Sequence, residues 1–296
     1  MSREDVEFKT LDGLTLRGHL YPAGAKSAAV IMTPGFNTTR DVFLPNIAQY
    51  FQSAGITALV YDPRTVASSD GTPPNNINPA QQVGDYHDAL TFLKSDPRVD
   101  ANRIAYWGFS FSGAVALCAA ALDKRAKLVV AVCPLTIWEL PENKRLRVMA
   151  KAMQDRESQL AGNAPFRLPM VTEKGDNPAG FGGSGVGPEE LRLIAEAKEK
   201  LGFEASTTLQ TYYNIMAWSP FDLIRFIAPT PTLLVTPEED AISPADKQRE
   251  LYYERIDGPK KIHVVAGRGH MNALDGETFA PTMEVQVEFI RSHLGK

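Results

Sequence analysis

The chain has 296 residues, a formal net charge of −4 and 44% hydrophobic residues, which is enough for one large α/β domain with a sizeable core. This acidic balance disfavours nucleic acid as a partner, and no apolar run approaches the ~18 residues of a membrane-spanning helix. The first ten residues are polar and charged, so we expect no secretory signal. Cys118 and Cys133 are expected to be buried thiols, and the protein is expected to be cytoplasmic.

Strand patterns open the chain and then alternate with helical patterns. A turn at Asp12-Gly13 predicts an antiparallel hairpin, and the later alternation predicts a mostly parallel sheet with helices on both faces. We therefore predict an α/β fold with an eight-stranded sheet and a site at the carboxyl ends of its strands. The expected strands are residues 6–10, 14–22, 28–34, 56–62, 103–109, 128–134, 232–236 and 260–265.

The region 135–221 is too long for a simple connection between two strands. Helical patterns near 144–159, 188–201 and 207–218 predict that it is a helical cap, inserted into a core made of residues 1–134 and 222–296. Its apolar and aromatic content suits a pocket for a hydrophobic substrate, although packing inside the cap is the better explanation for any one of these side chains. The predicted substrate contacts are Trp138, Tyr212, Met216, Trp218 and, beyond the cap, Met271.

The segment 107–113, Trp-Gly-Phe-Ser-Phe-Ser-Gly, is typical of a nucleophile elbow. It joins a β-rich run to an apolar helical run, so Ser110 falls at a strand-to-helix turn. Such a turn strains the serine backbone and requires small neighbours two residues away, which Gly108 and Ser112 provide. The usual pattern is G-x-S-x-G, whereas this chain has serine at the fifth position and Gly113 one residue later.

The partners of such a serine are expected in the chain order serine, acid, histidine. The strand ending near Thr236 leads into an acidic turn, where Asp240 is the predicted acid and Glu238 and Glu239 are alternatives. The last strand leads into a glycine-rich loop that carries His270, the predicted general base. The remaining histidines lie in expected strands or helices and lack this context: His19, His87, His263 and His293.

An acyl-transfer site also needs N–H donors for the oxyanion. One usually comes from the residue after the nucleophile, here Phe111, and the other from the loop after the third strand. That loop reads Thr-Pro-Gly-Phe-Asn, so the N–H of Phe36 is the predicted second donor. An ordinary Pro-Gly turn is the alternative interpretation of this loop.

These motifs resemble the α/β-hydrolase superfamily over most of the chain. The segments 61–64 (Tyr-Asp-Pro-Arg), 68–73 and 79–86 are more specifically similar to the fungal polyketide transferase family and related hydrolases of secondary metabolism. The resemblance implies hydrolysis or transfer of acyl groups. Related chains often carry glycines after the arginine, whereas this chain has Thr65, Val66 and Ala67, a change that concerns a pocket wall and leaves the triad intact.

The prediction is a serine-dependent acyl hydrolase or acyltransferase that uses Ser110, His270 and Asp240. Its substrate is expected to be a small-molecule ester or thioester, free or attached to a carrier protein or coenzyme A. Two alternatives remain open, a lyase or cyclase that uses only the His-Asp pair, and a ligand-binding protein on the same fold. No cofactor or metal site is predicted, because zinc-ligand spacings and a phosphate-binding lysine loop are missing from the sequence.

Four further features are given structural interpretations. Gly180–Gly185 matches G-x-G-x-x-G but follows no strand, so it is predicted to be a mobile cap loop. Arg64 is expected to tie loops together, and Asp62 and Asp85 to be hydrogen-bond partners. The basic cluster of the first cap helix fits a solvated helix face or a site for coenzyme A phosphates or an acidic carrier protein. Its members are Lys144, Arg145, Arg147 and Lys151.

Overall fold

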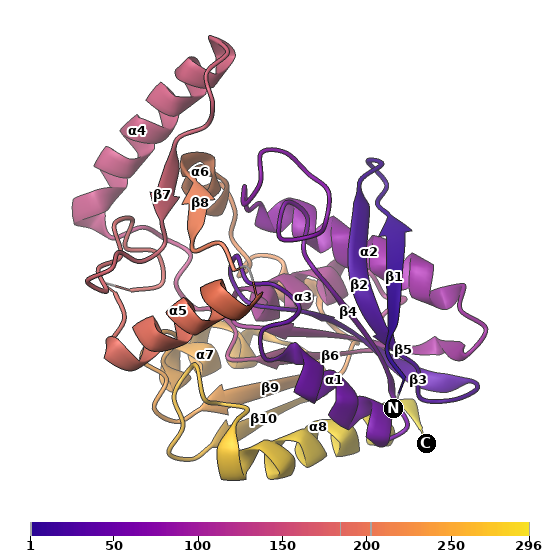
Figure 1. Ribbon diagram of the computed structural model, residues 1–296. Coiled ribbons are helices and arrows are strands. Elements are labelled where there is room, and N and C mark those ends of the chain that lie inside the picture. The colour runs from indigo at the N-terminus through magenta and orange to yellow at the C-terminus, as the bar shows by residue number, and fades with distance from the viewer. Residues whose placement is uncertain (1, 184, 202, 296) are drawn as a thin grey trace.

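An eight-stranded sheet runs through the computed structural model, which describes residues 2–183, 185–201 and 203–295 (Figure 1). The strand order is β1-β2-β4-β3-β5-β6-β9-β10. β2 pairs antiparallel with β1 and β4, and the other pairs are parallel, so the predicted mostly parallel sheet is confirmed. The strands are β1 (Glu4–Lys9), β2 (Thr15–Tyr21), β3 (Ser27–Thr33), β4 (Thr57–Tyr61), β5 (Val99–Phe109), β6 (Leu128–Val132), β9 (Thr232–Pro237) and β10 (Lys260–Val265).

Helices cover both faces of this sheet because successive residues of its buried strands point to opposite sides. On β3, Ile31 belongs to one apolar core and its neighbour Val30 to the other. The core on the side of Val30 is closed by α1 (Leu44–Ser53) and α8 (Phe279–Leu294). The opposite core is closed by α2 (Pro79–Lys94), α3 (Phe111–Leu122) and the segment after α7 (Ala245–Leu251). Short 3-10 helices lie at Ile224–Phe226, Tyr253–Arg255 and Gly276–Thr278.

Residues 133–223, here called the insertion, contribute three α-helices and a small second sheet within their described part. Its elements are α4 (Glu142–Leu160), β7 (Arg167–Pro169), α5 (Pro188–Leu201), β8 (Ser206–Thr208) and α6 (Leu209–Met216). The predicted helix over 207–218 starts later than expected, because the residues before Leu209 pair with β7. These strands are three residues long, too short to show an alternating pattern in the sequence.

The register of the central strands brings the ends of β3, β5, β6, β9 and β10 to one edge of the sheet. Thr33 at the end of β3 is level with Gly108 on β5, and Phe109 is level with Val132 on β6. Val132 is level with Val235 on β9, and Val265 with Pro237. The loops that follow these strands therefore meet above one edge. In the part of the chain that the structure describes, none of the helices is both long and apolar enough to span a membrane.

Candidate active site

Ser110 lies at the sharp turn between β5 and α3, with a φ of 56° and a ψ of −118°. Its N–H donates to the carbonyl of Val132 (2.8 Å), and its carbonyl accepts from the N–H of Leu135 (3.1 Å). A Cβ added at Gly108 would lie 2.0 Å from the carbonyl oxygen of Ser112, so only glycine fits there. The strained turn is thus held by β6 and allowed by Gly108, as the elbow pattern predicts.

The structure brings the three predicted catalytic side chains into one chain of hydrogen bonds. His270 Nε2 is 2.8 Å from Ser110 Oγ, and His270 Nδ1 is 2.8 Å from Asp240 Oδ2. All three residues are buried. A neutral imidazole that donates from Nδ1 to the carboxylate has its Nε2 lone pair free to accept the serine proton. This arrangement is able to activate a hydroxyl nucleophile.

Asp240 is fixed by donors from its own loop. Its Oδ1 accepts from the N–H groups of Ile242 (2.9 Å) and Ser243 (2.7 Å), and its Oδ2 accepts from Gln248 Nε2 at 3.3 Å. These donors compensate for the loss of water around a buried carboxylate. The two alternatives, Glu238 and Glu239, are exposed, and the structure does not bring them to His270.

The loop that carries His270 is held by contacts on both sides. Glu238 accepts from the N–H of Gly267 (2.9 Å), a residue whose φ of 63° suits glycine. The ring of Phe109 meets the imidazole edge to face, with 5.5 Å between the ring centres. Cys133 lies behind His270 and close to Asp240, and burial together with that carboxylate raises the pKa of its thiol well above the usual range. The thiol is therefore protonated and inert at neutral pH.

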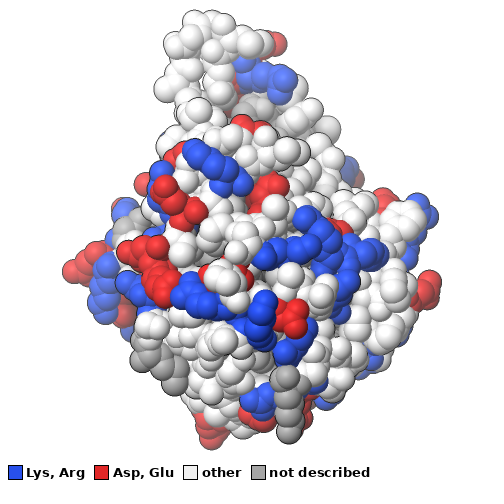
Figure 2. All heavy atoms as spheres, turned by 90° about the vertical axis from the view of Figure 1, so that its right-hand side faces the viewer, with Lys and Arg blue, Asp and Glu red and all other residues white. Residues whose placement is uncertain are grey.

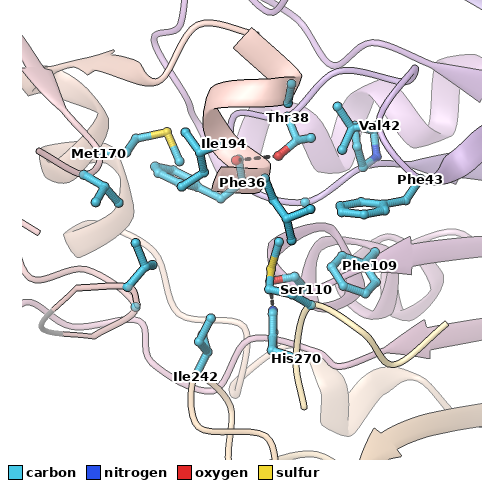
Figure 3. Close-up of a pocket in the computed structure, with 18 of the residues that line it drawn as sticks. Phe36, Thr38, Val42, Phe43, Phe109, Ser110, Met170, Ile194, Ile242 and His270 are labelled. Atoms are coloured by element: carbon cyan, nitrogen blue, oxygen red, sulfur yellow. Dashed lines mark hydrogen bonds between the residues drawn. The ribbon is translucent and has the colours of Figure 1, made fainter. Parts of the chain in front are cut away.

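The two predicted oxyanion donors flank the serine. Phe111 opens α3, and N–H groups in the first turn of a helix have no partner within the helix. Phe36 lies in the loop after β3 and lines the same cavity as Ser110 (Figure 3). Its carbonyl accepts from Thr38 Oγ1 at 3.0 Å, and its ring contacts that of Phe111, with 5.3 Å between ring centres. These contacts fix the loop beside the nucleophile.

Ser110 and His270 open into a cavity of about 240 Å³ between the sheet and the insertion. Figure 3 places Val42, Phe43 and Phe109 on one side of Ser110, and Met170, Ile194 and Ile242 on the other. The insertion supplies about half of the wall, and most of its contributions are apolar. They are Leu135, Met170, Val171, Asn177, Phe181, Gly182, Gly185, Val186, Leu193, Ile194, Ala197, Phe203, Ala205 and Tyr212.

Of the five predicted substrate contacts, Tyr212 and Met271 line this cavity, whereas Trp138, Met216 and Trp218 do not. Trp138 instead packs on Trp218 and Phe111, with ring centres 4.6 and 4.9 Å apart, and donates to the carbonyl of Leu135 (2.7 Å). The sulfur of Met216 accepts from the N–H of Leu140. Trp138 thus joins the insertion to α3, while Trp218 and Met216 contact other residues of the insertion. All three have the packing role that the sequence left open for them.

Several residues that line the cavity are not among the substrate contacts predicted from the sequence. Val42 and Phe43 come from the loop before α1, where Phe43 has a φ of 64° and nearly half of its side chain is exposed. The apolar face of α5 adds Leu193 and Ile194 to the wall. The sequence predicts this helix with its observed bounds, 188 to 201, but does not predict that these two side chains line the cavity. Its apolar spacing signalled a buried face but not what that face covers.

Arg64, Asp85 and Asp62 make hydrogen bonds that hold neighbouring segments together. Arg64 donates to Asp85 (2.6 and 2.9 Å) and to Asp12 (2.8 Å), so it ties loops together as expected. Burial raises the pKa of Asp85 to about 6, and Arg64 opposes that rise. Asp62 accepts from the N–H of Arg40 at 2.8 Å.

The glycine-rich segment 180–185 contributes Gly182 and Gly185 to the cavity wall, and Ser184 within it lies outside the described residues. Of the basic cluster, Lys144 donates to the carbonyl of Asn177 (2.7 Å) and so holds this same loop, while Arg147 and Lys151 are exposed. Among the described residues, one group of metal-ligand type is Cys133, Asp240 and His270. Its carboxylate and imidazole are already hydrogen-bonded to each other and to Ser110.

Comparisons with known proteins place the chain in a family. The alpha/beta hydrolase family matches residues 30–282. A thiohydrolase of Eupenicillium brefeldianum is 49% identical, covering 99% of this chain and 96% of its own. A polyketide transferase of Aspergillus fumigatus is 44% identical, covering 99% of each chain.

Two solved structures are similar along the whole chain. One is DcsB in complex with its substrate analogue, with a TM-score of 0.92, 41% identity and coverage of 99% of this chain and 100% of the other. The other is the alpha/beta hydrolase GrgF from Penicillium sp. sh18, with a TM-score of 0.90, 41% identity and full coverage of both chains. The chain therefore belongs to the alpha/beta hydrolase family, as an enzyme of the hydrolase or acyltransferase kind.

Proposed function

We propose that the protein is a serine-dependent acyl hydrolase or acyltransferase that forms an acyl-enzyme on Ser110. One observation carries this proposal. Two hydrogen bonds of 2.8 Å join Ser110, His270 and Asp240, and Ser110 lines an apolar cavity. A hydroxyl, a base and a buried carboxylate in this order are the parts that acyl transfer needs.

In the proposed reaction, Ser110 Oγ attacks the carbonyl carbon of the substrate while its proton passes to His270 Nε2. Asp240 stabilises the resulting imidazolium through Nδ1, and the N–H groups of Phe36 and Phe111 hold the oxyanion. His270 then gives the proton to the departing thiol or alcohol, which leaves an ester on Ser110. Water or an acceptor that carries an alcohol, amine or thiol resolves this ester, with His270 again acting as the base.

The proposed substrate is an ester or thioester with a hydrophobic, polyketide-derived acyl group. The apolar cavity wall favours an acyl chain without charge. Two relatives are a thiohydrolase and a polyketide transferase, which favours a thioester substrate and a polyketide product. The acyl group would then arrive on a carrier protein or coenzyme A. We further propose that residues 135–221 act as a cap that keeps water from the acyl-enzyme.

Two other functions use the same geometry differently. A lyase or cyclase would need His270 and Asp240 for proton transfer and no bond to Ser110. A ligand-binding protein would need only the cavity. The short Ser110–His270 contact favours the covalent reaction over both, because neither alternative requires that hydrogen bond.

The experiment is intact-protein mass spectrometry after exposure to a fluorophosphonate probe, with Ser110→Ala and His270→Ala as variants. Wild type is expected to gain one adduct, and both variants are expected to lose it. Ser112→Ala is the matched control, because Ser112 is buried two residues away and lies outside the triad. Folded wild-type protein without an adduct would overturn the proposal. Turnover retained by Ser110→Ala but abolished in His270→Ala would identify the lyase or cyclase.

A further inference from the structure

Asn37 directly follows Phe36, the residue whose N–H we propose as an oxyanion donor. It is buried, and its φ of 52° lies in the left-handed region, which asparagine tolerates better than most residues. Both ends of its carboxamide are used. Oδ1 accepts from Asn75 Nδ2 (2.9 Å), and Nδ2 donates to the carbonyls of Glu204 (2.8 Å) and Ser206 (3.2 Å). A buried amide that is satisfied at both ends holds its residue in one position.

These hydrogen bonds cross from the core to the insertion. Glu204 and Ser206 lie in the insertion, at the start of β8, whereas Asn37 lies in the core loop of residues 34–38, here called the Phe36 loop. Asn37 Nδ2 is also 3.3 Å from the sulfur of Met170. Met170 and Phe36 both line the cavity (Figure 3). One amide therefore joins the Phe36 loop to the part of the cavity wall that the insertion supplies.

Arg167 on β7 supports this amide from behind. Its guanidinium donates to Asn75 Oδ1 (3.0 Å), to the carbonyl of Pro74 (2.9 Å) and to Ser206 Oγ (3.0 Å). It thus holds the core residue that donates to Asn37 and also the strand whose carbonyl accepts from Asn37. Arg167 is itself partly exposed, so it is separated from the Phe36 loop by one layer of side chains.

Other polar contacts attach the insertion to the core away from the Phe36 loop. Asn214 on α6 donates to the carbonyl of Ile77 (3.0 Å), and Thr208 Oγ1 donates to Asn76 Oδ1 (2.7 Å). On the face shown in Figure 2, the projecting part of the molecule is mostly uncharged, whereas acidic and basic side chains are interspersed over the body below it. Hydrogen bonds to uncharged groups therefore contribute to the attachment of the insertion at two places, and Asn37 belongs to the place beside the nucleophile.

We propose that Asn37 is a positioning residue, whose amide sets the place of the Phe36 N–H relative to Ser110 and so makes stabilisation of the oxyanion depend on the attached insertion. This role rests on the proposed function. Asn37 acts only through Phe36 and touches no reacting atom. The oxyanion exists only after Ser110 has attacked, so displacement of this donor weakens binding of the transition state more than binding of the substrate.

The test compares two inhibitors with the same octyl chain. In the first, a trifluoromethyl ketone, Ser110 Oγ adds to the carbonyl carbon, its proton passes to His270, and the carbonyl oxygen becomes an oxyanion beside the Phe36 N–H. The second is the secondary alcohol of the same skeleton, which enters the cavity but forms no bond to the serine. Inhibition of the hydrolysis of a short aryl ester measures the affinity for each compound.

Asn37→Gly removes the amide and keeps a residue that accepts a φ of 52°. Affinity for the ketone and kcat for the ester are expected to fall about tenfold to hundredfold, whereas affinity for the alcohol should stay at the wild-type value. Arg167→Gln should cause a smaller loss that is also selective for the ketone. Asn214→Ala is the matched control, because it removes an amide that joins the insertion to the core elsewhere, and it should leave the ratio of the two affinities unchanged.

Three results would overturn this role of Asn37. The first is a ketone affinity that Asn37→Gly leaves unchanged. The second is an equal loss of affinity for ketone and alcohol, which would mean that Asn37 only shapes the cavity. The third is an equally selective loss in Asn214→Ala, which would mean that any loosening of the insertion has this effect.

Thermal midpoints show which variants fold. If Asn37→Gly does not fold, Arg167→Gln decides, and an unchanged ratio of the two affinities in that variant overturns the proposal. Failure of the proposed function is recognised separately, because wild type would then gain no fluorophosphonate adduct. A labelled wild type combined with any of the three results above removes the positioning role alone.

Discussion

The two sides of the cavity are built in different ways. On the core side, Ser110 is held by hydrogen bonds to Val132 and Leu135, and Asp240 by donors of its own loop. On the side of the insertion, the wall is assembled from α5, α6 and the loops between the insertion's elements, and apolar contact dominates. Strand register therefore fixes the groups that we propose to react, whereas side-chain packing shapes the cavity proposed for the substrate.

This difference separates two properties that substitutions can change. A change beside the triad moves groups that must keep their geometry within about 0.5 Å to react. A change in the wall alters how much space an acyl chain finds, and one methylene in an apolar pocket is worth only about 1–3 kcal/mol. We expect chemistry to depend on the core side and selectivity on the side of the insertion.

The largest effect is expected at Asp240. Asp240→Asn preserves the shape of the side chain but removes the charge that stabilises the imidazolium and fixes its tautomer, so kcat is expected to fall about ten-thousand-fold. The measurement is steady-state hydrolysis of a short aryl ester. Glu239→Gln, an exposed carboxylate in the preceding position, is the control and should retain wild-type activity. Comparable losses in both variants would contradict the assignment of Asp240 as the acid.

Both the sheet and the triad contacts could be anticipated because they follow from local rules. Buried parallel strands have apolar sequences, and the carboxyl ends of neighbouring strands meet at one edge. Three polar residues after three such strands, Ser110, Asp240 and His270, were therefore expected to approach one another. The structure places them 2.8 Å apart in the predicted order.

The wall of the cavity could not be anticipated in the same way. Trp138 and Trp218 have the composition of a ligand pocket, but their rings pack against each other and join the insertion to α3. Phe43 lines the cavity from a loop that has no periodic pattern. Apolar side chains do not reveal from the sequence whether they meet a ligand or one another, because burial favours both equally.

A smaller effect is expected at the glycine of the elbow. Gly108→Ala would place a Cβ 2.0 Å from the carbonyl oxygen of Ser112, so the turn must shift, and we expect a loss of about 3 kcal/mol in the free energy of unfolding. Gly84→Ala, inside α2 with open space around it, is expected to add about 0.5–1 kcal/mol. Urea denaturation monitored by circular dichroism measures both. Equal changes would contradict the close approach at Gly108.

The smallest effect concerns selectivity, and two alanines on α5 isolate it. Ala197 lines the cavity, whereas Ala195, on the same helix, is exposed. Ala197→Phe fills part of the space beside Ile194, so kcat/KM for long acyl thioesters is expected to fall at least tenfold relative to that for acetyl thioesters. Ala195→Phe adds the same volume toward solvent and should leave this ratio unchanged. If both variants shift the ratio equally, the substitutions act by destabilising α5, and the acyl chain is bound elsewhere. If only Ala197→Phe shifts it while acetyl turnover persists, the wall of the insertion selects the substrate independently of the triad.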